Sequence, residues 1–140
     1  MADECVFCKI MKGEIPCCKI YEDDKILAFL DIAPVNKGHM LVVPKKHFET
    51  LEDTDSETFK EIMLVAKKIA PVITKAVNAQ GFNLGFNNKK AAGQLVPHLH
   101  IHIIPRFEND DLTIDKQPTK KYAEKEMRET AEKIRNLLKK

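Results

Sequence analysis

The segment His98-Leu99-His100-Ile101-His102-Ile103-Ile104-Pro105 alternates histidine with apolar residues, and this pattern constrains the fold more than any other in the chain. In a β-strand, successive side chains point to opposite faces, and residues i and i+2 lie about 6.6–6.8 Å apart on one face. A strand here presents three imidazoles on one face and Leu99, Ile101 and Ile103 on the other. The apolar face can pack in a core, which leaves the histidine face available for a phosphate group or a metal ion.

A single domain is expected from 140 residues, because domains typically hold about 100–200 residues. The formal net charge of +2 gives no reason to expect a nucleic-acid partner. No apolar run approaches the roughly 20 residues that span a bilayer. Asp3, Glu4 and Lys9 interrupt the apolar run that a signal peptide needs. We therefore expect a cytoplasmic protein that binds neither nucleic acid nor membranes, with reduced or metal-bound cysteines.

Hydrophobic periodicity predicts an α+β fold. Apolar residues recur at three- and four-residue steps from Ser56 to Val77, which predicts a long amphipathic helix that Pro71 bends. Short strands are predicted at 19–22, 26–31, 40–43, 83–86 and over the histidine segment, and a short helix at 7–11. Strands adjacent in sequence favour an antiparallel meander with the long helix on one face. After an irregular connector at 108–118, a helical stripe at 120–138 packs either on this domain or on a second subunit.

His100 is the candidate nucleophile. A neutral imidazole is nucleophilic near neutral pH, because its unperturbed pKa is about 6.5. It can displace a leaving group from phosphorus and form a transient phosphorus–nitrogen bond. Such a nucleophile needs its other ring nitrogen held as a donor, and further donors for the phosphoryl oxygens. Gly93 and Gln94, just upstream, can bring backbone and amide donors close to a phosphate.

A second candidate site is metallic. Cys5-Val6-Phe7-Cys8 has the two-residue gap that lets both thiolates reach one Zn²⁺, although a single such pair also suits two buried thiols. Two more ligands are needed, and any site must be assembled by the fold. The candidate nitrogen donors are His39, His47, His98, His100 and His102. Neighbouring Cys17 and Cys18 are interpreted as packing residues.

Beyond the histidine segment, a series of short segments resembles the HINT-like branch of the histidine triad (HIT) family. The histidine segment fits the family pattern His-φ-His-φ-His-φ-φ, in which φ is apolar. The other matching segments, in the family's order, are Phe7-Cys8-Lys9-Ile10, Gly13-Glu14-Ile15-Pro16, Ala28-Phe29-Leu30-Asp31-Ile32, Lys37-Gly38-His39, Val43-Pro44-Lys45-Lys46-His47, Asn87-Asn88 and Ala92-Gly93-Gln94. The resemblance implies a HIT domain at 1–106 and a C-terminal extension with a helix at 107–140.

The resemblance also implies an activity. By this resemblance, the protein would be a homodimer that binds purine nucleotides and cleaves the bond between a nucleoside monophosphate and a leaving group. His100 would take the nucleotidyl group, His98 would orient it, and His102 would lie against the α-phosphate. The nucleotide-binding residues implied by position are Phe7, Ile10, Phe29, Leu30 and Ile32 around the base, Asp31 at the ribose hydroxyls, and Asn87, Gly93 and Gln94 near the phosphate. A flat purine suits an apolar slot, and a carboxylate suits a vicinal diol.

Members of this branch with paired cysteines can bind zinc. Carried over by position, the ligands are Cys5, Cys8, His47 and His98, which would form a closed, structural tetrahedral site. His98 would then serve both the metal and the active site.

Two positions depart from the family pattern on the leaving-group side. Leu95 stands where the branch often has a hydroxyl residue, and Lys89 stands where it often has glycine. Taken as a whole, the resemblance predicts a hydrolase of nucleoside 5'-phosphoramidates or related nucleotidyl conjugates. The alternatives are a dinucleoside polyphosphate hydrolase, a zinc-stabilised nucleotide-sensing or scaffold dimer with weak catalysis, and a metallohydrolase whose triad holds the ion.

Overall fold

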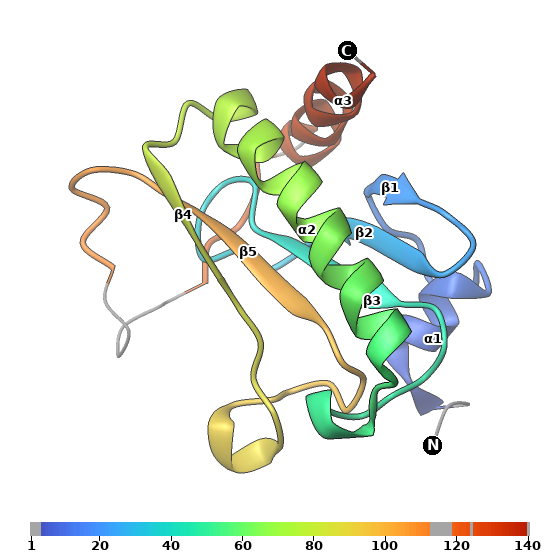
Figure 1. Cartoon of the computed structure of the whole chain (residues 1–140). Coiled ribbons are helices and arrows are strands. Elements are labelled where there is room, and N and C mark those ends of the chain that lie inside the picture. Colours follow the sequence, from blue (N-terminus) through green and yellow to red (C-terminus); the bar gives the residue numbers. More distant parts are fainter. Residues whose placement is uncertain (1–3, 113–118, 124, 140) are drawn as a thin grey trace.

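The computed structural model describes residues 4–112, 119–123 and 125–139. Its centre is a five-stranded antiparallel sheet in the order β1-β2-β3-β5-β4 (Figure 1). The strands are β1 (Lys19–Glu22), β2 (Ile26–Leu30), β3 (Met40–Pro44), β4 (Gly81–Gly85) and β5 (Ile101–Arg106). The predicted α+β class is confirmed.

The strand order differs from a simple meander. Only β1, β2 and β3 follow one another across the sheet, because β5 lies between β3 and β4. The long connection from β3 to β4 contains the helix α2 (Ser56–Ala76), so β4 need not lie beside β3. Buried Ile101 and Ile103 suit β5 to the interior position, whereas the mostly exposed β4 suits the edge.

Helices α1 (Val6–Met11), α2 and α3 (Glu126–Leu138) complete the fold. The Asp55 side chain caps α2 by accepting a hydrogen bond from the Thr58 backbone N–H at 2.8 Å, and the helix continues through Pro71. Helix α3 packs beside α2 and β1 (Figure 1). It begins later than predicted, after Lys125 at a φ of 70°. In the described part of the chain, no helix is both long and apolar enough to cross a membrane.

The two faces of the sheet carry different cores. The larger core lies between the sheet and α2, where Ile62, Ile69 and Ile73 are fully buried. A smaller cluster on the opposite face contains residues of α1 together with Phe29 and Leu41. Since directly paired residues share a face of the sheet, the pairings Phe29–Leu41 and Leu41–His102 place His102 on this second face.

The histidine segment is a strand only in its second half. β5 begins at Ile101, so His98 and His100 precede the regular ladder, and the prediction of a strand over the whole segment is wrong there. The reason lies in the neighbouring strand, which ends at Pro44, a residue without a backbone N–H to continue the pairing. Leu99 instead donates its N–H to the Phe48 carbonyl at 2.6 Å.

Candidate functional site

The buried His100 ring is held in one tautomer by its own chain. Its Nδ1 lies 2.7 Å from the His98 carbonyl oxygen, which can only accept, so Nδ1 carries the hydrogen. The Nε2 of the neutral ring then keeps its lone pair. Phe7 packs edge-on against this ring at a centroid distance of 5.0 Å, which restricts its orientation.

His102 is oriented by a second histidine from the end of the β2–β3 loop. The Val35 N–H donates to His39 Nδ1 at 3.0 Å, so the hydrogen of a neutral His39 lies on Nε2. That Nε2 lies 2.9 Å from His102 Nδ1, which must accept. His102 therefore carries its own hydrogen on Nε2. His100 therefore presents a lone pair on Nε2, and His102 presents an N–H donor on its own Nε2.

Asp31, His39 and His102 are close enough to suggest a second metal site. The hydrogen bonds argue against it, because both ring nitrogens of His39 are already engaged, one as acceptor and one as donor. Asp31 Oδ2 lies 3.7 Å from His39 Nε2, and the negative charge of the carboxylate favours a hydrogen on that nitrogen. This group is therefore a hydrogen-bonded chain.

Burial keeps these histidines neutral. Desolvation, reinforced by the proximity of His100, lowers the pKa of His39 from 6.5 to about 4. The pKa of His102 falls to about 4 for the same leading reason, with smaller effects from His100 and His39. Burial also lowers the pKa of His100, against the opposing effects of its bond to the His98 carbonyl and the charge of Asp31. The lone pair on His100 is therefore available at neutral pH.

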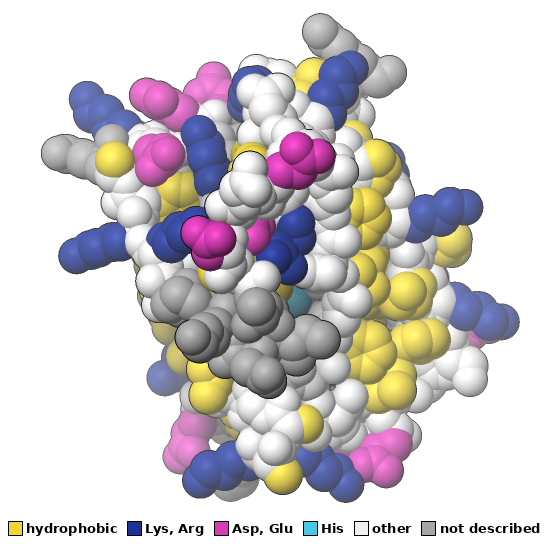
Figure 2. Space-filling view, turned by 90° about the vertical axis from the view of Figure 1, so that its left-hand side faces the viewer, with side chains coloured by type: hydrophobic (Ala, Val, Ile, Leu, Met, Phe, Trp, Pro, Cys, Tyr) yellow, Lys and Arg dark blue, Asp and Glu magenta, His cyan; other side chains and the backbone are white. Residues whose placement is uncertain are grey.

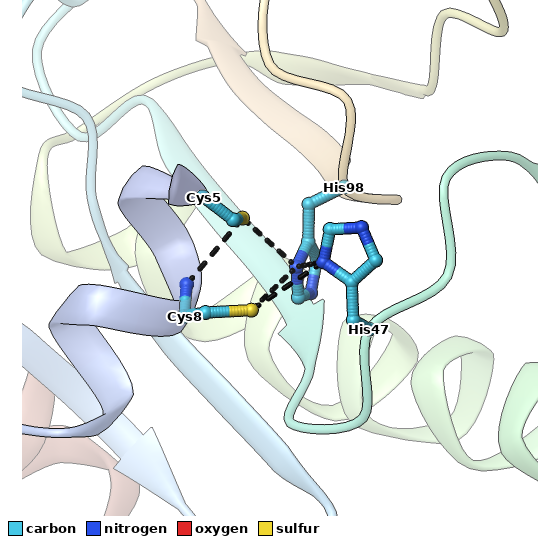
Figure 3. Close-up of side chains that lie close together, drawn as sticks. All are labelled: Cys5, Cys8, His47 and His98. Carbon is cyan, nitrogen blue, oxygen red and sulfur yellow. Dashed lines mark hydrogen bonds between the residues drawn. The ribbon is translucent and has the colours of Figure 1, made fainter. Parts of the chain in front are cut away.

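Cys5, Cys8, His47 and His98 converge from three parts of the chain (Figure 3). The cysteines come from the start of α1, His47 from the loop after β3, and His98 from the segment before β5. His98 Nε2 donates to the Pro44 carbonyl at 2.8 Å, so its Nδ1 faces the other three residues as a lone pair.

The geometry of this group fits a tetrahedral zinc ion. With zinc–sulfur distances of about 2.3 Å and zinc–nitrogen distances of about 2.0–2.1 Å, tetrahedral ligand atoms lie about 3.3 Å apart for two nitrogens and about 3.6 Å apart for nitrogen and sulfur. The two Nδ1 atoms of His47 and His98 are 3.1 Å apart. The sulfur–nitrogen distances are 3.3 Å for Cys5–His98, 3.4 Å for Cys8–His47 and 3.6 Å for Cys8–His98. Four soft or borderline donors at these separations suit Zn²⁺.

The residues expected around a base are divided between two faces. Phe7 contacts Phe29 edge-on at 5.7 Å, and Ile10 packs against the same small cluster. Ile32 is 77% exposed, beyond the end of β2. Leu30 needs correction, because successive strand residues alternate and its buried side chain packs in the core beneath α2. It therefore does not line the face that carries Phe7 and Phe29.

The loop expected near the phosphate is held by the Gln94 side chain, which bonds both within the loop and to Glu49. Gln94 accepts from the Lys89 N–H at 2.6 Å and donates to the Glu49 carbonyl at 2.6 Å. Gly93 adopts a φ of 90°, and a Cβ there would lie 3.6 Å from the Asn87 side-chain nitrogen. These contacts give Gln94 a structural role in shaping the loop, while Leu95 is 93% exposed beside it.

His39 is the participant whose role sequence reasoning missed. The sequence indicates His39 only as a possible metal ligand and as part of the Lys37-Gly38-His39 segment. Its contact with His102 joins residues 63 positions apart, which no local pattern reports. That shared segment was the only available signal.

Comparison with known sequences gives a consistent family. The profile of the HIT domain matches residues 12–109. The adenylylsulfatase HINT3 of Arabidopsis thaliana is 47% identical over 112 residues, 80% of this chain and 57% of the relative, so the chain spans under two thirds of that protein. The adenosine 5'-monophosphoramidase hnt1 of Schizosaccharomyces pombe is 46% identical over 102 residues, 73% of this chain and 74% of the relative.

Solved structures agree with the sequence comparison. A Zn-bound histidine triad family protein from Mycobacterium smegmatis superposes with a TM-score of 0.88 at 36% identity. The match covers 99% of this chain and 96% of that one, so it includes the region beyond residue 109.

Proposed function

Because the chain belongs to the HIT family, we propose that it binds nucleotides and hydrolyses nucleotidyl conjugates at the histidine cluster. The favoured substrates are purine nucleoside 5'-phosphoramidates and related conjugates. The main support for this proposal is which ring nitrogens of His100 and His102 carry a hydrogen. A lone pair on His100 Nε2 and a donor on His102 Nε2 are the complementary groups that phosphoryl transfer requires.

The reaction has two displacements at phosphorus. In the first, His100 Nε2 attacks the α-phosphorus in line with the leaving group, a phosphorus–nitrogen bond forms, and the bond to the leaving group breaks. An amine leaves as the neutral molecule after its nitrogen has gained a proton from water. In the second, water attacks the nucleotidyl-imidazole, the bond to His100 breaks, and the nucleoside monophosphate is released with loss of a proton to solvent.

His102 stabilises the charge that develops on the phosphoryl oxygens. Its Nε2–H donates to a non-bridging oxygen, and the bond from His39 to Nδ1 prevents the opposite tautomer. His98 contributes through its backbone, since its carbonyl fixes the proton on His100. The three histidines of the triad thus have different tasks although they share one short segment.

The nucleoside part would bind on the same face of the sheet. Phe7 and Phe29 form an aromatic corner next to His100, with Ile10 beside it and Ile32 at its exposed edge. Asp31, at the end of β2, accepts hydrogen bonds from the ribose hydroxyls. Asn87, Gly93 and Gln94 remain the residues proposed near the phosphate and leaving group.

Zinc would have a structural role in this protein. Cys5, Cys8, His47 and His98 would hold the ion, which neutralises two buried thiolates and ties α1 to the segment that bears His100. The zinc-bound relative from Mycobacterium smegmatis supports this assignment. Because all four donors are supplied by the chain, no position is left for substrate.

A second copy of the chain is the proposed protein partner. β4 is the outermost strand of the sheet, so its outer edge can pair with another strand. Phe82 and Leu84 of β4 and Leu64 of α2 are exposed. Figure 2, which views the molecule from the left-hand side of Figure 1, shows hydrophobic side chains gathered in a band on the right. Sedimentation equilibrium should give a dimer for the native chain and a monomer for Leu84→Asp; a native monomer at micromolar concentration would contradict the proposal.

The activity is tested by comparing substrates and one variant. The native protein should release AMP from adenosine 5'-phosphoramidate faster than from diadenosine tetraphosphate, whereas His100→Ala should bind AMP without turnover. Faster cleavage of the tetraphosphate would favour the polyphosphate hydrolase. Tight AMP binding by the native protein with no turnover of either substrate would favour the nucleotide sensor. Full activity of His100→Ala would overturn the mechanism.

A further inference from the structure

The loop between β2 and β3 carries two groups of the proposed site. Asp31 lies at its beginning and His39 at its end, and the Asp31 N–H donates to the His39 carbonyl at 2.9 Å. The Asp31 carboxylate also accepts from the Ala33 N–H at 2.9 Å. The position of this one loop therefore sets both the ribose acceptor and the residue that orients His102.

The outer side of this loop is held by residues from the C-terminal extension. The Lys120 N–H donates to the Pro34 carbonyl at 2.6 Å, and Lys120 Nζ donates to Asn36 Oδ1 at 2.5 Å. The Gly38 N–H donates to the Tyr122 hydroxyl oxygen at 3.0 Å. These three bonds are spaced along the loop between Asp31 and His39.

Asn36 joins the loop to a second segment. Its side chain is fully buried, and Nδ2 donates to the Pro105 carbonyl at 2.9 Å and to Asp110 Oδ2 at 3.0 Å. Arg106 holds the same Asp110 through Nε and Nη2, each at 2.8 Å. With Lys120 on its oxygen, Asn36 connects the loop, the end of β5 and the C-terminal extension.

Packing on the inner side leaves the loop little room to move. Gly38 adopts a φ of 89°, and a Cβ there would lie 3.1–3.2 Å from Ile73, Val77 and Pro105. The buried Gly38 N–H faces the half-buried Tyr122, and Lys37 Nζ lies 3.6 Å from Glu126 Oε2 at the start of α3. The loop is thus confined by α2 and β5 on one side and by the extension on the other.

We propose that Tyr122 and Lys120 of the C-terminal extension are positioning residues that clamp the β2–β3 loop, Lys120 by bonding to Asn36 of the loop, and so set the affinity of the site for the nucleotide ribose. The proposal rests on the proposed function, in which Asp31 receives the ribose hydroxyls. Tyr122 and Lys120 both lie outside residues 12–109, which match the HIT domain, so the clamp is supplied by the extension. Neither residue touches the reacting atoms; each acts through the loop.

The test compares two bonds made by the same extension. Tyr122→Phe removes the acceptor for the Gly38 N–H and keeps the ring. Arg135→Met is the matched control, because Arg135 Nη1 donates to the Lys19 carbonyl at 2.6 Å and so ties α3 to β1, away from the loop. Calorimetric titration measures the affinity of each protein for AMP and for 2',3'-dideoxy-AMP, which lacks the hydroxyls that Asp31 would bind.

The native protein should prefer AMP to the dideoxy analogue. Tyr122→Phe should weaken AMP binding by at least about threefold and dideoxy-AMP binding by less, while Arg135→Met should leave both affinities unchanged. Lys120→Met, which removes the bond to Asn36 from an exposed residue, should have the effect of Tyr122→Phe and serves if that variant does not fold.

The outcomes separate the clamp from the proposed function. If the native protein does not bind AMP, the proposed function fails. If it binds AMP and both loop variants keep the native preference for AMP, the clamp is overturned. The clamp would also be overturned if Tyr122→Phe and Arg135→Met both weakened the binding of AMP and of 2',3'-dideoxy-AMP to the same extent. The extension would then only stabilise the fold.

Discussion

His39 Nε2 lies 2.9 Å from His102 Nδ1, and this bond determines which nitrogen of His102 carries a hydrogen. The constraint begins one step earlier, at the Val35 N–H that donates to His39 Nδ1. A backbone amide of the β2–β3 loop thus determines the proton position on a side chain of β5. The chemistry of the site depends on this loop as much as on the histidine segment.

Replacing His39 should lower turnover through His102. In His39→Ala, His102 loses the bond that fixes both its tautomer and the orientation of its ring, so its donor is no longer held toward the phosphate. We expect kcat for adenosine 5'-phosphoramidate to fall by about 100-fold. His39→Gln can still donate to His102 Nδ1 and should lose about tenfold or less. Equal losses in both variants, measured at pH 7.5, would show that the hydrogen bond is not what matters.

His39 also makes stability depend on pH. Its pKa is lowered from 6.5 to about 4 by burial, so as pH falls the unfolded chain takes up a proton before the folded one does. The contribution of His39 to the free energy of unfolding should be complete above about pH 6.5. Between pH 6.5 and 4 it should decline by roughly 1.4 kcal/mol per pH unit. Urea unfolding at several pH values should give a shallower decline for His39→Gln; identical slopes would argue against a neutral, buried His39.

The cysteine–histidine group should behave as a structural zinc site. We expect about one zinc per chain in the purified protein, and a chelator should lower the unfolding temperature of the native protein. Cys8→Ser should lower it as well, and the chelator should then have little further effect. Activity that falls on chelation while the protein stays folded, judged by circular dichroism, would instead indicate a catalytic ion.

Lys89 should be a strained position. Its φ of 74° and ψ of 159° lie in a region that glycine adopts readily, and such strain costs about 1–3 kcal/mol. The exposed ion pair with Glu52 at 2.7 Å offsets little of it. Lys89→Gly should therefore be more stable than Lys89→Ala by roughly 1 kcal/mol, after allowance for the greater freedom of glycine when unfolded. Urea midpoints compare the two variants, and a more stable alanine variant would refute the strain.

The amino-acid pattern predicted the elements better than their arrangement. Alternation and helical periodicity located α2 and the strands to within a few residues. The position of β5 between β3 and β4 was not predictable in the same way, because strand order depends on which apolar faces pack together. Pro44 indicates that the β3–β5 pairing does not extend to His100, but only once β3 is known to be the neighbour of β5.

Distinctive residue types indicated candidates for the site. Paired cysteines and alternating histidines singled out Cys5, Cys8 and His100 and left five histidines as possible nitrogen ligands, from which the family resemblance selected His47 and His98. Leu30 was misplaced, because a resemblance by position does not say toward which face a side chain points. The Asn36–Lys120 bond spans 84 residues between common residue types, and no sequence pattern reports such a contact.

In the proposed mechanism, His100 forms a bond to phosphorus during turnover. The most direct measurement is rapid quenching of the native protein with excess adenosine 5'-phosphoramidate at alkaline pH, followed by peptide mass mapping. We expect a nucleotidyl adduct on His100 that appears within the first turnover and decays as substrate is consumed. Steady AMP release with no adduct on His100, under conditions in which a synthetic nucleotidyl-imidazole survives the same quench, would contradict it.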